Sequence, residues 1–496
     1  MSNGIDTSQG LMGPVVRGGK WLVLAETAVR ATHTVRTLVL MVLFSAKDWG
    51  LWAAIFTTLH LLRNLSDTGI SMVAIQHREG DSAEVLSTTW WLEVLRGVVL
   101  GGLLVVLAPV VGLCFPDSGP RLVGLLRVVS LVFLLEGFVS VGIITAQRRL
   151  AFNRLVLIQQ GSTMLSILLA VVLGVVFRNV LALVIAELLR ATLLLALSYV
   201  VLPVRPSLAA GFATLVLLLR RGWHLYVARL SEFLTLRGAV FVVGRILGTT
   251  QLGCYHLALN FGLLPSIFIT AVVSRVIFPA FAKMQDDSTR LKEALLRVQR
   301  FVVQVCVPAS LGIVALAPVL AAIKGIEYAP MVRPTQVFAL AVVAAGVSSI
   351  NVSALLGLGR FDLVRKLRLL QLLLVAFAIY PLTRYFGLPG AAMVAWLELV
   401  IWVLVARLNG RRIGCGVGVQ LRNMLFIIAP AAAMGLTVAL LWCFLHDRII
   451  LYAVGVIVLS PAAYFLALWR AAPVHARESW DVLKQAVGGS SAEGLS

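Results

Sequence analysis

Long apolar stretches separated by short polar ones extend along almost the whole chain. From about residue 20 to residue 469 these stretches reach 18 residues or more, which is long enough for a helix to cross the ~30 Å hydrocarbon core of a bilayer. The pattern predicts an all-α polytopic membrane protein with fourteen transmembrane helices. The predicted ranges are 20–44, 50–75, 88–113, 122–146, 153–176, 180–203, 222–247, 251–281, 298–317, 334–357, 366–384, 388–407, 422–445 and 449–469.

The distribution of positive charge supports this helix count. If the N-terminus is cytoplasmic, most of the 42 lysines and arginines lie in connections that face the cytoplasm, as the positive-inside rule requires. We therefore expect both termini on the cytoplasmic side. The net charge of +20 also suits anionic membrane lipid. Because the cations are dispersed between helices, nucleic acid is not expected as a partner.

Composition and motifs exclude several classes of protein. The chain is 60% hydrophobic and 13% charged, whereas soluble domains are about 45–50% apolar and about 25% charged. The polar, glycine-rich residues 1–19 do not resemble a cleaved signal peptide. Phosphate-binding loops, HExxH spacing, a Gly-x-Ser-x-Gly turn and paired catalytic carboxylates are absent from the sequence. We therefore expect neither an enzyme nor a cofactor.

The chain contains an internal repeat. Residues 43–52 align with 246–255, 107–111 with 316–320, 147–159 with 359–371, and 179–187 with 390–398, with offsets between 203 and 212. Each copy holds six helices, an even number, so the copies insert in the same orientation and form two lobes with the substrate between them. The predicted organisation is a tail (1–19), an N-lobe (20–203), a linker that could lie in the interface (204–221), a C-lobe (222–410), a C-terminal helical hairpin (420–470) and a second tail (471–496).

Polar side chains form stripes on some of the predicted helices. In "HLLRNLSDTGIS" (60–71), the residues His60, Arg63, Asn64 and Asp67 are three or four apart, which places them on one helix face. Polar groups within a membrane usually face a partner or a water-filled cavity. This stripe therefore predicts a hydrated cavity.

The cations within the predicted helices are all arginines: Arg30, Arg36, Arg63, Arg96, Arg127, Arg190, Arg229, Arg237, Arg245 and Arg275. Five have a carboxylate three or four residues away, in the pairs Glu26–Arg30, Arg63–Asp67, Glu93–Arg96, Glu187–Arg190 and Arg229–Glu232. Each of these five is either a structural ion pair or part of a ligand site. An arginine stays charged, and its planar guanidinium binds phosphate in a bidentate way, which suits a diphosphate ligand.

Arg36 and Arg237 have no local acidic partner and lie deep in equivalent helices of the two repeats. The predicted cationic, substrate-binding residues are Arg30, Arg36, Arg63, Arg229, Arg237 and Arg275, and the polar residues of the same cavity are His33, His60, Asn64, Tyr226, His256 and Asn260. Asp67 and Glu26 are candidates for ion coupling, although Asp67 is equally well explained as the structural partner of Arg63. The histidines show no metal-ligand spacing, so no metal site is expected.

Three segments resemble the polysaccharide transporter family, which comprises oligosaccharide-lipid flippases of the multidrug/oligosaccharidyl-lipid/polysaccharide exporter superfamily. They are "LSDTGISMVAIQHREGDSAEVLSTTWWLEVLRG" (65–97), residues 255–300, and "ALLGLGRFDLVRK" (354–366). The most specific match is Ser274-Arg275-x-x-Phe278-Pro279 followed by Gln285-Asp286-Asp287. By motif, the resemblance carries over only Asp67, Gly69, Gln76 and Arg275.

The resemblance implies two six-helix lobes around a cationic cavity and an added hairpin. It also implies transfer of polyprenyl-diphosphate-linked oligosaccharides between the leaflets of a bacterial inner membrane, beside a polymerase and export proteins. Two alternatives within the superfamily stay open, a peptidoglycan-precursor flippase and a cation-coupled drug exporter. A membrane glycan polymerase or ligase is the alternative of another class.

Overall fold

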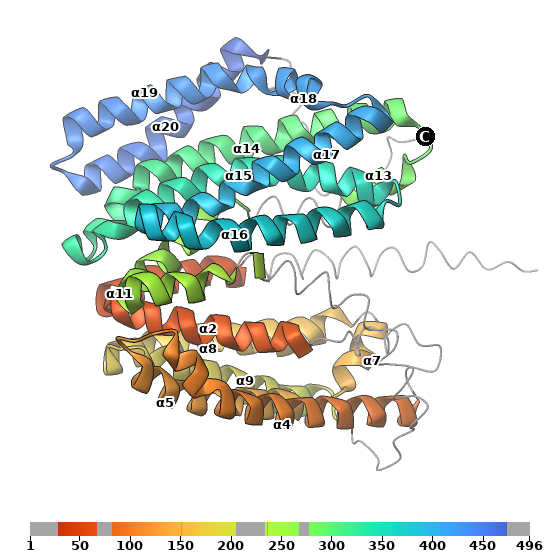
Figure 1. Cartoon of the computed structure of the whole chain (residues 1–496), viewed down its shortest axis with the longest axis vertical. Coiled ribbons are helices and arrows are strands. Elements are labelled where there is room, and N and C mark those ends of the chain that lie inside the picture. The colour runs from red at the N-terminus through yellow and green to blue at the C-terminus, as the bar shows by residue number, and fades with distance from the viewer. Residues whose placement is uncertain are drawn as a thin grey trace, which may run out of the picture. The chain divides into compact units, whose positions relative to one another are not determined.

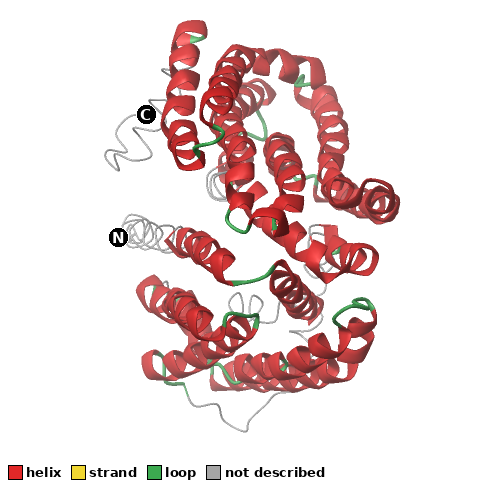
Figure 2. Cartoon of the chain, turned by 90° about the vertical axis from the view of Figure 1, so that its left-hand side faces the viewer, coloured by secondary structure: helices red, strands yellow, loops and turns green. Residues whose placement is uncertain are grey.

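The computed structural model describes residues 28–66, 82–149, 151–204, 234–235, 237–266 and 277–473. Within these ranges the chain consists of helices and short connections, and no residue is in a strand (Figure 2). Each of the fourteen predicted helices corresponds to helical residues in the described ranges, so the predicted all-α class is confirmed. The chain divides into two compact units, Met1–Gly253 and Cys254–Ser496.

Among the described residues, the first unit contains the helical residues 28–43 and seven complete helices, six of which are labelled in Figure 1. They are α2 (Ala46–Ser66), α4 (Ala83–Leu113), α5 (Gly119–Val129), α6 (Leu131–Gly137), α7 (Gly142–Arg148), α8 (Phe152–Phe177) and α9 (Leu181–Val201). Helix α4 packs against α5 and α6, α8 packs against α9, and α6 also contacts α9. The predicted helix 122–146 is broken, because the chain bends by 57° between Gly137 and Gly142.

Helix α11 (Ala239–Gly262) is also broken and belongs to both units. Gly248 has φ 85° and ψ 171°, and divides it into two segments. This conformation favours glycine, which has no Cβ to clash. The carboxylate of Asp117 accepts hydrogen bonds from the backbone N–H of Thr249 (3.0 Å) and from its hydroxyl group (2.8 Å). Asp117 thereby satisfies donors at the start of the second segment, as N-caps do.

The segment after Gly248 lies in direct backbone contact with α2. A Cβ atom added to Gly50 would lie 1.8 Å from the carbonyl oxygen of Thr249, and one added to Gly253 would lie 1.8 Å from the carbonyl oxygen of Ala46. Small residues permit such close crossings of transmembrane helices. The alignment of residues 43–52 with 246–255 makes Ala46 equivalent to Thr249 and Gly50 equivalent to Gly253. The contact is therefore reciprocal between equivalent positions of the repeat.

The second unit contains the remaining helices. They are α13 (Phe278–Lys283), α14 (Ser288–Ala322), the short 3₁₀ helices η2 (Gly325–Glu327) and η3 (Ala329–Met331), α15 (Val332–Gly357), α16 (Phe361–Met393), η4 (Val394–Trp396), α17 (Leu397–Ile413), α18 (Val417–Met424), η5 (Leu425–Ile427), α19 (Ile428–Leu445) and α20 (Ile449–Ala471). Gly387, with φ 62°, separates the helices predicted at 366–384 and 388–407 within α16. Helices α19 and α20 pack together as a hairpin.

Side-chain amides hold the core of the second unit together. Gln420 on α18 donates to the Asn351 side chain on α15 (2.8 Å), and the Gln420 carbonyl accepts from Trp402 Nε1 (3.0 Å). Asn409 on α17 donates to the same Asn351 oxygen (3.0 Å). Asn351, Asn409 and Gln420 are fully buried, where an unsatisfied polar group would be costly. The network therefore fixes α15, α17 and α18 against one another.

The predicted linker 204–221 lies outside the described residues except for Val204, so the lobe boundaries remain predictions. The predicted tail 1–19 also lies outside the described residues, as does the tail 471–496 after residue 473.

We expect substitution of Gly50 by alanine to destabilise the protein. The added Cβ has no space beside Thr249, and overpacking a tight contact costs about 1–3 kcal/mol. Gly102→Ala is the matched control, because a Cβ at Gly102 on α4 meets no atom within 4 Å and alanine favours helix by about 1 kcal/mol. Thermal unfolding of the purified variants in detergent measures both effects. Equal melting temperatures for the two variants would contradict the close contact.

Candidate functional site

Two arginines and two glutamates meet in the interior of the first unit. Arg63 on α2 donates to Glu136 on α6 through Nε (3.1 Å) and Nη2 (2.8 Å), and Nη2 also donates to Glu187 on α9 (3.0 Å). Arg190, one turn after Glu187, donates to both Glu187 oxygens (3.1 and 2.9 Å) and to Glu136. We call Arg63, Glu136, Glu187 and Arg190 the charge cluster.

The charge cluster is electrically balanced and largely removed from solvent. The side chains of Arg63 and Arg190 are each 19% exposed, and those of Glu136 and Glu187 are 24% and 16% exposed. Carboxylates that accept several charge-assisted hydrogen bonds are strong partners for guanidinium groups. Removing one member of such a buried set leaves an uncompensated charge. The cluster therefore joins α2, α6 and α9, and its two carboxylates balance the charges of Arg63 and Arg190.

Two further arginines lie beside this cluster. Arg36, on the helical residues 28–43, is within electrostatic range of Glu187. His60 on α2 is within electrostatic range of Arg237 as well as of Arg63, Glu136 and Glu187. Among the described residues, four arginines and two carboxylates therefore lie at or near this part of the first unit.

Arg36 has a buried donor that no described residue satisfies. Its Nε atom is buried and has no hydrogen-bond partner among the described residues. The same residues offer it no hydrogen-bonded carboxylate. His33, almost one turn before Arg36, is within electrostatic range of Arg36, Glu187 and Arg190. Because buried donors are normally satisfied, the Arg36 guanidinium suits an incoming phosphate oxygen.

Arg237 lies against an aromatic column on α2. Its Cζ atom is 5.5 Å from the centroid of the Phe56 ring, within the distance of a cation–π interaction. The Phe56 and His60 rings are 4.1 Å apart, and Trp52 lies one turn earlier with its centroid 6.0 Å from that of Phe56. The spacing of four residues stacks these rings on one helix face. The column thereby links Arg237 to the polar stripe that begins at His60.

The structure brings some of the predicted site residues together. Arg36, Arg63, Arg237, His33 and His60 lie at or beside the charge cluster. Arg30 is half-buried on the same helix as Arg36, and the half-buried Asn64 donates to the His60 carbonyl (2.7 Å). His256 is buried and Asn260 half-buried, both in the second unit. The roles of these residues in binding remain predictions.

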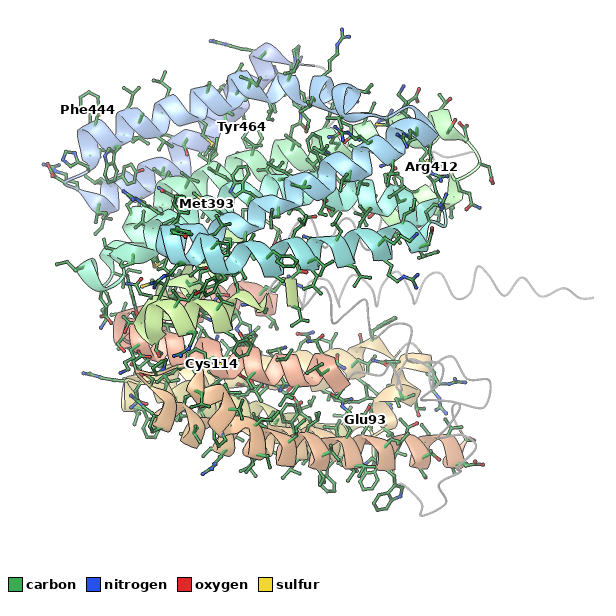
Figure 3. All side chains as sticks on the ribbon, viewed as in Figure 1. Glu93, Cys114, Met393, Arg412, Phe444 and Tyr464 are labelled. Atoms are coloured by element: carbon green, nitrogen blue, oxygen red, sulfur yellow. The ribbon has the colours of Figure 1, made fainter. Side chains whose placement is uncertain are left out.

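Five predicted residues lie outside the described ranges: Glu26, Asp67, Tyr226, Arg229 and Arg275. The proposed Arg63–Asp67 and Glu26–Arg30 pairs therefore stay predictions. The local pairs Glu187–Arg190 and Glu93–Arg96 are present, with N–O distances of 2.9 and 2.8 Å, so the structural interpretation is confirmed for them (Glu93 is labelled in Figure 3). No group of three His, Cys, Asp or Glu residues in the described ranges is arranged to hold a metal ion.

Two important residues were missed by the sequence analysis. Glu136 is an isolated carboxylate in an apolar helix, a feature that by itself indicates a buried partner or a functional site. Phe56 is signalled only by its four-residue spacing from Trp52 and His60, which is also common in ordinary cores. Neither signal names Arg63 or Arg237 as the partner.

The chain is similar in sequence to proteins of polysaccharide biosynthesis. Residues 39–333 match the family described as polysaccharide biosynthesis protein. Over 306 residues the chain is 27% identical to the lipopolysaccharide biosynthesis protein WzxC of Escherichia coli (strain K12), spanning 61% of each chain. It is 25% identical to the teichuronic acid biosynthesis protein TuaB of Bacillus subtilis (strain 168) over 394 residues, which cover 79% of this chain and 80% of TuaB.

Solved structures share the fold at low sequence identity. The lipid II flippase MurJ in an inward closed conformation superposes with a TM-score of 0.71 and 12% identity, covering 90% of this chain and 98% of MurJ. An inward-facing multidrug resistance transporter of the MATE family superposes with a TM-score of 0.60 and 15% identity, covering 79% of this chain and 98% of that transporter. The fold is therefore that of a membrane transporter.

We expect Glu187→Gln to destabilise the protein, because it leaves Arg63 and Arg190 with one carboxylate. Loss of one partner from a buried ion pair typically costs about 3–5 kcal/mol. The double variant Glu187→Gln/Arg190→Gln restores the charge balance, so it should lose less stability than the sum of the two single variants. Thermal or denaturant unfolding of the four proteins measures this coupling. Additive losses would show that the cluster does not act as a unit.

Proposed function

Because the chain belongs to the polysaccharide biosynthesis protein family, we propose that it is a flippase for polyprenyl-diphosphate-linked oligosaccharide repeat units. It moves them from the cytoplasmic to the periplasmic leaflet of a bacterial inner membrane for synthesis of an exopolysaccharide, capsule or O-antigen. Transport proceeds by alternating access of the two lobes, and both termini are cytoplasmic. A polymerase and export proteins of the same pathway are the expected partners.

The arginines at and beside the charge cluster carry this proposal. Glu136 and Glu187 balance two of the four arginines, Arg63 and Arg190. Arg36 and Arg237 lie beside this balanced cluster, and the buried Nε atom of Arg36 has no hydrogen-bond partner among the described residues. A diphosphate diester carries about two negative charges near pH 7, and guanidinium groups bind phosphate oxygens with matched geometry. We therefore assign the diphosphate to Arg36 and Arg237.

The rest of the substrate fits the properties of a membrane transporter. The polyprenyl chain is as apolar as the lipid around it and stays in the bilayer, so only the diphosphate and the glycan need a polar path. Half-buried polar residues beside the arginines, His33 and His60, supply hydrogen-bonding groups for the glycan along that path. We place the glycan on the side of the cluster where these histidines lie.

Two functions found within the superfamily compete with this proposal. A peptidoglycan-precursor flippase is favoured by the similarity to MurJ and would use the same diphosphate chemistry on a different glycan. A cation-coupled drug exporter is favoured by the similarity to MATE transporters. The arginines at and beside the charge cluster would repel a cationic drug, so they favour a lipid-linked anion over drug export.

The direct test is leaflet exposure of a polyprenyl-diphosphate oligosaccharide in proteoliposomes that contain the full chain. We expect Arg237→Ala and Arg36→Ala each to reduce transport by about 10–100-fold, because each removes a charge-assisted hydrogen bond worth about 1.5–3 kcal/mol. Arg36→Lys should retain part of the activity, since it keeps the charge and loses the bidentate geometry.

Arg127→Ala is the matched control, because Arg127 is an exposed arginine on α5 and should leave transport unchanged. Folding is checked by the melting temperature of each variant. Full transport by both Arg36→Ala and Arg237→Ala would contradict the assigned diphosphate site but not the function. If the wild type moves no lipid-linked glycan and exports cationic drugs, the flippase proposal is wrong.

A further inference from the structure

The second unit contains an open groove that the proposed transport does not use. Its volume is about 500 Å³, and it lies between the first turns of α15 and the break in α16. The lining residues are Arg333, Gln336, Val337, Leu340, Phe386, Pro389, Met393 and Trp396 (Met393 is labelled in Figure 3). Small-molecule sites commonly have volumes of about 300–1,000 Å³.

A tight turn of the chain forms one wall of this groove. Gly387 adopts φ 62°, a conformation that favours glycine. A Cβ added to Gly390 would lie 2.0 Å from the carbonyl oxygen of Leu382, so the chain folds back closely on itself. This turn exposes Phe386 and Met393 beside Leu340 of α15. The wall is therefore lined by apolar side chains, and the backbone of the turn fixes its position.

One end of the groove is cationic. Arg333 lies in the first turn of α15 and is exposed, and it forms no ion pair with any described residue. The equivalent arginine of the other repeat differs, because it has an acidic neighbour. Arg121, in the first turn of the equivalent helix in the other repeat, lies 3.7 Å from Asp48. The alignment pairs Asp48 with Gln251, a neutral residue, so the second repeat lacks the acid that engages Arg121.

The surroundings of the groove indicate a membrane–water interface. Tyr380, Tyr385 and Phe386 are exposed near the end of the helix segment that precedes Gly387, and Trp396 is exposed in η4. Tyrosine and tryptophan are enriched where headgroups meet the hydrocarbon core. An amphiphile at this depth would place its head beside Arg333 and its chain along Leu340 and Met393.

We propose that this groove binds an anionic phospholipid of the surrounding leaflet, with the phosphate at Arg333 and one acyl chain against Leu340, Phe386 and Met393. Gln336 lines the headgroup end, where its side-chain carbonyl can accept from a glycerol hydroxyl. In the proposed orientation this is the periplasmic leaflet. The site is separate from the cluster assigned to the diphosphate, so it stands or falls independently of the transport function.

Tryptophan quenching by brominated lipids tests this site in proteoliposomes of the full chain. Vesicles of phosphatidylcholine receive increasing fractions of brominated phosphatidylglycerol or brominated phosphatidylcholine, and the signal of Trp396 is the difference between wild type and Trp396→Phe. We expect half-quenching of Trp396 at about a fivefold lower fraction of brominated phosphatidylglycerol than of brominated phosphatidylcholine. One interfacial cation contributes about that factor in affinity.

Arg333→Gln should remove the headgroup preference, and Arg333→Lys should keep most of it. Arg384→Gln is the matched control, because Arg384 is an exposed arginine of the same helix end that does not line the groove. Equal quenching by both lipids in the wild type would overturn the proposal. So would an equal loss in Arg384→Gln, or displacement of the brominated lipid by polyprenyl phosphate but not by phosphatidylglycerol.

Discussion

A guanidinium group remains ionised inside a protein, so every arginine within an apolar helix bundle needs a carboxylate or a ligand. This constraint organises the first unit. Arg63 and Arg190 take up Glu136 and Glu187, and the pairing joins three helices that are far apart in the sequence. Both carboxylates are engaged by hydrogen bonds from these two arginines. Arg36 and Arg237 lie beside the cluster, and this arrangement is the basis of the proposed anion site.

The close contact between α2 and the segment of α11 after Gly248 lies on the same helix as part of this site. Ala46 and Gly50 of α2 meet Thr249 and Gly253 at backbone distance, and these positions are equivalent in the repeat. The aromatic column and the polar stripe that lead to the charge cluster follow the crossing along the same helix α2. Arg237 precedes the other partner of the crossing in the chain.

Much of this arrangement was predictable from local sequence. Apolar runs set the helices, because backbone groups in lipid must be satisfied within the segment. The Glu187–Arg190 pair follows from its spacing of three residues. The pairing of Arg63 with Glu136 was not predictable in this way, because 73 residues separate them and only the assembly of the first unit brings them together.

Other features depend on the same kind of long-range information. The buried amides Asn351, Asn409 and Gln420 look like ordinary polar residues in the sequence, and their network exists only once α15, α17 and α18 are assembled. The groove beside Arg333 depends on the turn at Gly387, which divides α16 into two segments. The repeat allows charges at equivalent positions to be compared: Arg121 lies near Asp48, whereas Arg333 has no ion pair with a described residue.

The most direct test of the central claim is an experimental structure of the full chain with a polyprenyl-diphosphate oligosaccharide bound. The account predicts the diphosphate within hydrogen-bond distance of the Arg36 and Arg237 guanidinium groups, with Arg63 and Arg190 still paired to Glu136 and Glu187. A diphosphate bound to Arg63 or Arg190, with their carboxylates displaced, would show that the charge cluster itself is the binding site and would contradict the assignment to Arg36 and Arg237.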